Sequence, residues 1–173
     1  MNNRQLGFTL VELVVVIILI GILGVTATSK MIGPSSFDAY LNRDQAISIA
    51  RQVQILSMNQ SISSATDPNA SCYTLQISSD YFGSPRCDSV LPSMPPALTA
   101  ADNNLSLSAE GLTVTNLYFD MLGQPFYFTG SGANEARVYA CRSNSGCKLT
   151  FRSGANETTT MCINQEGYIY ADC

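Results

Sequence analysis

The stretch "GFTLVELVVVIILIGILGV", from Gly7 to Val25, is almost entirely apolar and yet contains one carboxylate, Glu12. Residues 13–29 carry no formal charge, and together with residues 8–12 they make an apolar run of 22 residues. A helix of that length is roughly 33 Å long, which is close to the hydrocarbon thickness of a bilayer. The sequence therefore predicts a transmembrane helix over residues 8–29.

Glu12 does not fit an ordinary membrane anchor. A charge at the centre of a membrane helix costs on the order of 2.5–3.5 kcal/mol, although snorkelling lowers the cost near a helix end. Arg4 precedes the run, so the positive-inside rule places the N-terminus in the cytoplasm and the remainder outside. A cleaved secretory signal is the alternative, and "GVTATSK" is a fair match to its small-x-small site. Neither a signal nor a plain anchor has a use for a glutamate inside its apolar block.

The segment "RQLGFTLVELVVVIILIGILG" resembles the class III-type N-terminus of type IV prepilins and of type II secretion pseudopilins. The resemblance implies that a membrane-embedded prepilin peptidase cuts between Gly7 and Phe8 and methylates the new amine of Phe8. It also implies that Glu12 meets the amino terminus of a neighbouring subunit in a filament. A carboxylate and an ammonium offset each other's burial cost, which either group alone cannot do. The alternative interpretation of Glu12 is a tolerated interfacial charge.

The apolar run is followed by a second predicted helix. Residues 35–60 have helical periodicity, and Ser35 or Ser36 is the expected N-cap. The expected core face holds apolar residues at a spacing of three or four: Phe37, Tyr40, Leu41, Ala46, Ile47, Ile49, Ala50, Val53 and Leu56. Asn42 lies on the opposite, polar face. Relatives in the resembled family carry a proline soon after the apolar run, whereas here it comes late, so we expect a bend near Gly33–Pro34.

Beyond residue 60 the period of the pattern changes from helical to alternating. The predicted strands cover residues 71–78, 105–108, 112–119, 126–129, 136–141, 148–152, 159–163 and 168–171. Residues 79–104 hold four prolines and are expected to be irregular. The sequence thus predicts an α+β fold, in which a long N-terminal helix packs on an antiparallel sheet head. We divide it into a leader (1–7), a transmembrane or filament-core helix (8–29), an amphipathic second half (30–60) and a β-rich head (61–173).

Six cysteines lie beyond residue 70, and none forms a C-x-x-C motif. Such a pattern favours disulfides and an oxidising compartment such as the periplasm or the cell surface. Six cysteines allow 15 connectivities. Among them we favour the sequential pairs Cys72–Cys87, Cys141–Cys147 and Cys162–Cys173. Cys141 and Cys147 are expected to face each other across a hairpin. The pair Cys162–Cys173 requires the residues after the last strand to fold back.

Two segments of the head resemble recurring features of the same family. "FDMLGQPF", from Phe119 to Phe126, is similar to an F-D-x-x-G-x-P turn of minor pilins and pseudopilins. There Gly123 permits a positive φ, and the carboxylate of Asp120 can accept hydrogen bonds from nearby backbone N–H groups. The final "CINQEGYIYADC" looks like the closing hairpin of GspH/FimT-like heads.

The sequence contains no pattern that indicates an enzyme. Histidine is absent, and there is no nucleophile elbow, phosphate loop, zinc motif or EF-hand, so we expect no catalytic residue, cofactor or metal. A formal charge of −4 disfavours nucleic acid. One basic segment, residues 136–153, departs from this. Its basic residues Arg137, Arg142, Lys148 and Arg152 would form a DNA- or surface-binding patch across two paired strands, or else solvated strand faces that pair with acids elsewhere.

These observations favour a minor pilin, and the resemblance is closest to one from MSHA-type pili. It would be a single-pass inner-membrane protein with a periplasmic head, and later part of a pilus on the cell surface. The expected partners are other pilins or pseudopilins through the N-terminal helix, prepilin peptidase and the pilus assembly platform. The expected role is incorporation into a pilus, or priming of its assembly, in support of adhesion or motility. The alternatives are a GspH-like secretion pseudopilin, a DNA-binding minor pilin for DNA uptake, and a plain inner-membrane protein with a periplasmic domain.

Overall fold

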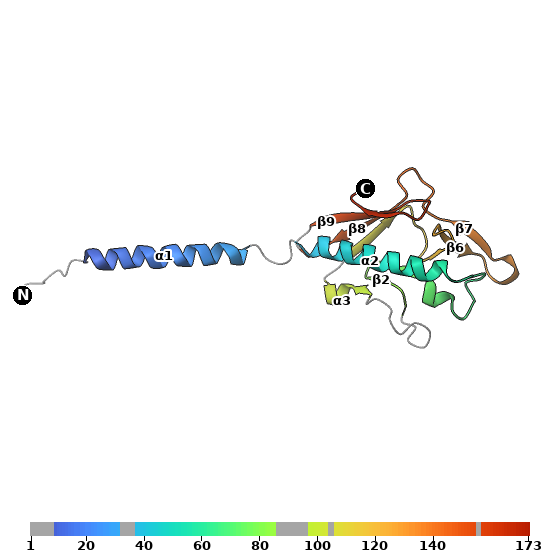
Figure 1. Cartoon of the computed structure of the whole chain (residues 1–173), viewed down its shortest axis with the longest axis horizontal. Coiled ribbons are helices and arrows are strands. Elements are labelled where there is room, and N and C mark those ends of the chain that lie inside the picture. The colour runs from blue at the N-terminus through green and yellow to red at the C-terminus, as the bar shows by residue number, and fades with distance from the viewer. Residues whose placement is uncertain (1–8, 32–36, 86–96, 104–105, 155–156) are drawn as a thin grey trace, which may run out of the picture. The chain divides into compact units, whose positions relative to one another are not determined.

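The computed structural model describes residues 9–31, 37–85, 97–103, 106–154 and 157–173 (Figure 1). For residues 24–31 and 102–103 it describes the backbone alone. The chain divides into two compact units, residues 1–34 and residues 35–173. The predicted bend at Gly33–Pro34 and the predicted caps Ser35 and Ser36 lie outside the described residues.

The first unit contains helix α1 (Leu10–Met31), which covers most of the predicted helix 8–29 and the first two residues of the predicted second half, 30–60. Every described side chain of α1 is exposed. The exposed fraction of its large apolar side chains ranges from 40% at Val14 to 79% at Leu10. Among the residues that the structure describes, no helix is both long enough and apolar enough to cross a membrane.

The second unit is built on helix α2 (Asp38–Met58). Its buried residues repeat every three or four positions: Ala39, Asn42, Ala46, Ile49, Ala50, Val53 and Ser57. The expected face was therefore wrong at its start, because Phe37, Tyr40 and Leu41 are exposed, whereas Asn42 is only 3% exposed. The physical reason is packing distance, since the three alanines let the helix backbone lie close to the strands.

Two antiparallel sheets make up most of the rest of the second unit, as far as its residues are described. The first has the order β3-β2-β1-β5-β6-β7. Its strands are β1 (Leu75–Ile77), β2 (Tyr81–Gly83), β3 (Leu98–Thr99), β5 (Asn116–Phe119), β6 (Pro125–Thr129) and β7 (Ala136–Tyr139). The second has the order β10-β9-β8-β4. Its strands are β4 (Ser106–Glu110), β8 (Cys147–Arg152), β9 (Thr158–Ile163) and β10 (Ile169–Ala171). The predicted α+β class, with a helix on antiparallel sheets, is confirmed.

The region before β4 differs from the prediction. Of the predicted strand 71–78, only Leu75–Ile77 is extended, because residues Ala70–Tyr73 form the 3₁₀ helix η2. Residues 79–104, predicted to be irregular, contain β2, β3 and the short helix α3 (Ala100–Asn103). Burial explains the first of these strands, since Phe82 in β2 is fully buried and pairs with β1. A further 3₁₀ turn, η3 (Gly132–Asn134), follows β6.

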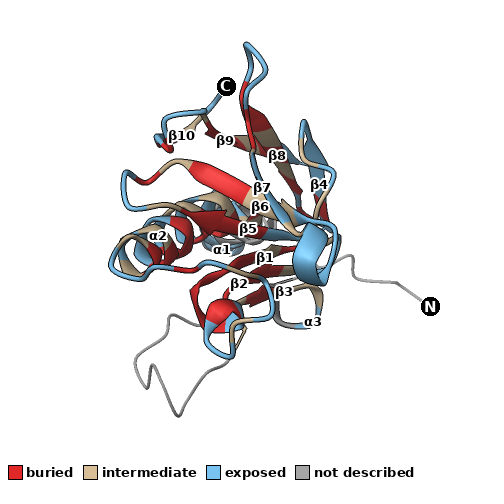
Figure 2. Ribbon diagram, turned by 90° about the vertical axis from the view of Figure 1, so that its right-hand side faces the viewer, coloured by how far each residue is buried: buried red, intermediate tan, exposed pale blue. Residues whose placement is uncertain are grey.

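The core lies between α2 and the two sheets (Figure 2). Phe82 of β2 and Phe151 of β8 meet edge to face, with ring centroids 5.9 Å apart, and so join one sheet to the other. A second apolar cluster surrounds Tyr118 and Phe126, whose rings stack at 5.6 Å. The head therefore contains an apolar interior of its own, to which α2 contributes one whole face.

Candidate functional site

The first turn of α1 contains Glu12 and is closed by Thr9. The backbone N–H of Leu13 donates to the carbonyl oxygen of Thr9, and the N–H of Glu12 donates to the Thr9 hydroxyl at 3.2 Å. Thr9 is therefore the N-cap, and Thr9-x-x-Glu12 has the spacing of a capping box. A carboxylate in the first turn is also favourable against the helix dipole. Sequence reasoning missed this second role of Glu12, although the Thr-x-x-Glu spacing signals it.

From Leu13 to Leu23, the surface of α1 is apolar on every side. From Leu13 to Leu23 each described residue is valine, isoleucine or leucine, except Gly21. A helix that is apolar all round requires apolar surroundings on all sides. The described side chains of α1 are exposed, so the helix by itself does not supply those surroundings. The predicted cleavage residues Gly7 and Phe8 lie outside the described residues.

In the head, one side chain of α2 holds two turns together. Gln54 Nε2 donates to the carbonyl oxygens of Gly123 and Gly167, at 2.9 and 2.8 Å. The first turn is closed by Asp120, whose Oδ1 accepts from the N–H groups of Leu122 and Gln124 at 2.9 and 2.8 Å. Gly123 has a φ of +83°, so the predicted roles of Asp120 and Gly123 are confirmed. The role of Gln54 was not predicted, because its two partners are 69 and 113 residues away.

A second α2 side chain, Arg43, ties the start of that helix to β9 and to Asp172. Its Nη1 donates to Thr159 Oγ1 at 3.1 Å and to Asp172 Oδ1 at 2.8 Å, and its Nε donates to Asp44 Oδ1 at 2.9 Å. Burial lowers the pKa of Arg43, but the hydrogen bonds and charges of Asp44 and Asp172 raise it further, so the net shift is upward. The guanidinium stays charged and fixes the residues after β10 against α2.

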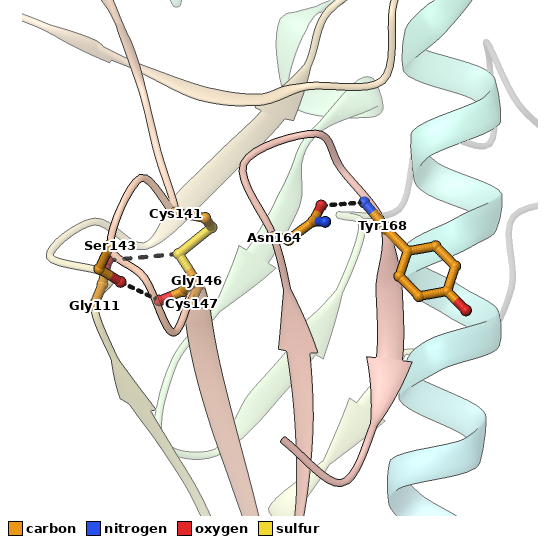
Figure 3. The surroundings of a disulfide bond; sticks show 7 residues. All are labelled: Gly111, Cys141, Ser143, Gly146, Cys147, Asn164 and Tyr168. Carbon is orange, nitrogen blue, oxygen red and sulfur yellow. Dashed lines mark hydrogen bonds between the residues drawn. A yellow bond between two sulfur atoms is a disulfide. The ribbon is translucent and has the colours of Figure 1, made fainter.

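The disulfides follow the sequential pattern wherever both cysteines are described. Cys141 bonds to Cys147 (Figure 3) and Cys162 bonds to Cys173, with Cα–Cα distances of 4.6 and 5.9 Å. Cys72 is also disulfide-bonded, and its predicted partner Cys87 lies outside the described residues. The fold-back that Cys173 requires comes from Asp172, which has a φ of +57° and whose N–H donates to Thr160 O at 3.0 Å.

The expected hairpin between residues 136–141 and 148–152 is wrong. β7 pairs with β6, whereas β8 pairs with β4 and β9, so the two strands belong to different sheets. Cys141 has a φ of +55°, which turns the chain after β7, and Ser143 to Gly146 form a tight turn before β8 (Figure 3). The disulfide therefore joins one sheet to the other, and burial of both cysteines favours this arrangement.

This topology separates the four basic residues of the predicted patch. Arg137 on β7 is engaged within the head, because Nη2 donates to Ile62 O in the loop after α2 at 2.7 Å and the guanidinium lies 4.1 Å from the centre of the Phe126 ring on β6. Lys148 and Arg152 lie on the other sheet, where Lys148 is the cross-strand partner of Glu110. Sequence reasoning missed these contacts because they depend on the pairing of distant strands.

The last of the four, Arg142, follows β7 and lies 5.5 Å from the Tyr139 ring. The expected continuous basic patch across two paired strands is therefore not formed by these residues. Within the described ranges, no cluster of three or more histidine, cysteine, aspartate or glutamate side chains is arranged to hold a metal ion.

Comparison with known proteins bears on the N-terminal segment. Residues 2–28 match the family model of the prokaryotic N-terminal methylation motif. Comparisons with curated proteins and with solved structures found no match. The matched segment includes Gly7, Phe8, Thr9 and Glu12. The motif indicates a type IV pilin-like or pseudopilin protein, for which association with other pilins and with prepilin peptidase is the general expectation.

Proposed function

We propose that this chain is a minor type IV pilin, of the kind found in MSHA-type pili. In this proposal prepilin peptidase cuts between Gly7 and Phe8 and methylates the Phe8 amine. The apolar helix then holds the subunit in the inner membrane with its head in the periplasm. At the assembly platform the helix leaves the bilayer and enters a filament, at or near the tip, where the subunit primes or supports assembly of a pilus used in adhesion or motility.

The observation that carries the proposal is the surface of α1. It is apolar on every described side from Leu13 to Leu23, and a single carboxylate stands in its first turn. Sister helices in a filament would bury the apolar surface, and the amine of a neighbouring Phe8 would neutralise Glu12. Lipid tails are as apolar as these side chains, so lateral packing in a filament contributes close van der Waals contact between helices and not the removal of apolar surface from water. The ion pair then selects the register, because a misplaced charge would remain unpaired in an apolar bundle.

In this proposal the head has a structural or binding role. Its hydrogen-bonded side chains, such as Gln54, Ser57 and Arg43, hold α2 to the sheets and their turns. A type II secretion pseudopilin would have the same kind of N-terminal segment, with its cleavage site, glutamate and apolar helix, and is the nearest alternative. Deletion of the gene distinguishes the two, since loss of surface filaments supports the pilin proposal and loss of protein secretion supports the pseudopilin. DNA uptake has less support, because Arg137 is engaged within the head.

The test separates the two roles of Glu12. Glu12→Gln keeps a side chain that serves in a capping box but removes the charge, whereas Thr9→Ala removes the capping oxygen and keeps the charge. We expect Glu12→Gln to be processed normally and yet to reduce the pilin in sheared filaments at least tenfold. Thr9→Ala should reduce it much less. Processing is followed by the loss of seven residues on a gel, and assembly by immunoblot of the sheared fraction.

The opposite result would refute the assembly role. If Glu12→Gln assembles like the wild type while Thr9→Ala does not, Glu12 acts only as a helix cap. If both variants assemble normally, neither the cap nor the ion pair is required for assembly. If the wild-type chain is itself absent from the sheared fraction, the chain is better described as a plain inner-membrane protein.

A further inference from the structure

The face of α2 that points away from the sheets carries an ordered stripe of side chains. Leu41, Ser48 and Ile55 are seven residues apart and lie on one side of the helix. The two apolar residues are 57% and 61% exposed, and Ser48 is exposed as well. A groove of about 550 Å³ follows this face, and its lining residues are Asp44, Ile47, Ser48, Arg51, Gln52, Ile55 and Leu56.

The stripe is self-complementary when it is reversed about Ser48. Leu41 lies seven residues before Ser48 and Ile55 seven residues after it, so a two-fold axis at Ser48 places Leu41 of one helix beside Ile55 of the other. Asp44 lies four residues before the axis and Arg51 three residues after it, so each carboxylate meets a guanidinium of the opposite chain. A two-fold interface requires such pairing of a patch with itself, and the small serine at its centre allows the helices to approach closely.

Both charged groups are held in place for such a contact. Asp44 is bonded to Arg43 at 2.9 Å, and its side chain is still 64% exposed. Arg51 is exposed and donates from Nη2 to the carbonyl oxygen of Ile169 at 2.8 Å. A guanidinium has five N–H groups, so other donors are left for a partner. Because these bonds already restrict both side chains, less conformational entropy is lost when a partner binds.

We propose that the α2 face docks on the α2 face of a second copy of this chain, with the two helices antiparallel. A parallel arrangement would put Asp44 against Asp44 and Arg51 against Arg51, and like charges disfavour it. An anionic membrane surface is also a poor occupant, since the face carries one acid for its one arginine. From Leu41 to Ile55 the contact is about 21 Å long, so we expect a small interface and a weak, reversible dimer.

The dimer is independent of the filament role of α1, because all its contacts come from the head. In a filament-forming subunit it would provide a storage form or a paired form of the head.

Charge exchange tests the proposal in the purified full-length chain, in detergent, by analytical ultracentrifugation. Asp44→Arg and Arg51→Asp each place like charges across the two-fold axis, and each should weaken self-association by about tenfold. The double variant restores opposite charges and should return the dissociation constant to within about threefold of the wild type. Glu157→Lys, an exposed reversal outside α2, is the control and should leave the dissociation constant unchanged. Association through α1 is the same in all variants and therefore cancels in the comparison.

A second measurement covers variants that fail to fold. Ser48→Cys places a thiol at the proposed axis, and we expect a disulfide-linked dimer on a non-reducing gel, whereas the exposed control Thr158→Cys should stay monomeric. Equal cross-linking of the two, no cross-linking of Ser48→Cys, or a double charge variant no better than the single ones would each overturn the proposal. Glu12→Gln should leave dimerisation intact, which separates this inference from the filament proposal.

Discussion

Replacement of Ser57 by alanine tests how α2 is joined to the sheet. Ser57 is fully buried, and its hydroxyl donates to Phe119 O at 2.7 Å and accepts from Phe119 N at 3.2 Å. The ladder between β1 and β5 ends at the pair Leu75–Leu117, so the serine supplies the partners that β1 does not. In Ser57→Ala both backbone groups of the buried Phe119 lose a partner.

The expected loss follows from this geometry. An unsatisfied buried polar group costs about 1–3 kcal/mol, and the alanine regains roughly 0.5 kcal/mol in helix propensity. Two such groups together should lower the free energy of unfolding by about 1.5–5.5 kcal/mol, which is a shift of roughly 1–3 M in the urea midpoint. Near-UV circular dichroism follows the head, because the chain has eight tyrosines and no tryptophan.

The matched control is Ser48→Ala, which makes the same chemical change at an exposed position of the same helix. A change within about 0.5 kcal/mol is expected there. If Ser57→Ala loses no more stability than Ser48→Ala, the two buried hydrogen bonds do not contribute as argued, and the close contact between α2 and β5 is not what holds the helix.

Two further predictions concern the turn at Gly167, which Gln54 binds, and the buried Tyr118. Gly167 has a φ of +81°, and a Cβ there would overlap the carbonyl oxygen of Gly123 in the neighbouring turn. Gly132 also has a positive φ, of +59°, but a Cβ there would meet no other atom. Gly167→Ala should therefore lower the melting temperature clearly more than Gly132→Ala, and equal losses would contradict the close approach of the two turns. Burial raises the pKa of Tyr118 in the folded head, so the Tyr118 hydroxyl loses its proton at a lower pH in the unfolded chain than in the folded one. The free energy of unfolding therefore falls as the pH rises from about 10 through the folded pKa. Tyr118→Phe should flatten this alkaline loss in urea midpoints, whereas the exposed Tyr168→Phe should not, and equal effects would refute the assignment.

The local elements of the fold were predictable from the sequence because their signals are local. The spacing of apolar residues marks α2, alternation marks the strands from β4 to β10, and glycine with aspartate marks the 120–124 turn. The same holds for the first turn of α1, where Thr9 and Glu12 are three residues apart. Pairing of cysteines that are close in sequence also follows from chain geometry, since short loops bring their ends together easily.

Contacts between residues that are far apart in the sequence were not predictable in the same way. Periodicity places Asn42 on a polar face, but the packing distance set by the alanines of α2 buries it. Turn chemistry between Cys141 and Cys147 suggests a hairpin, yet the flanking strands join different sheets. Gln54 holds two turns that lie 69 and 113 residues away. Each of these outcomes depends on which surfaces meet after collapse.

The sequence by itself determined that the chain has an apolar N-terminal helix with one carboxylate in its first turn, because both are properties of a single contiguous segment. Only the tertiary structure determined which groups the charged residues of the head contact and which of these residues stay exposed. Arg137 was a candidate ligand contact in the sequence, and in the fold it is engaged on Phe126 and Ile62. Asp44 and Arg51 were ordinary polar-face residues, and in the fold they share an exposed groove. The reason is that a charge acts through its surroundings, and distant parts of the chain supply them.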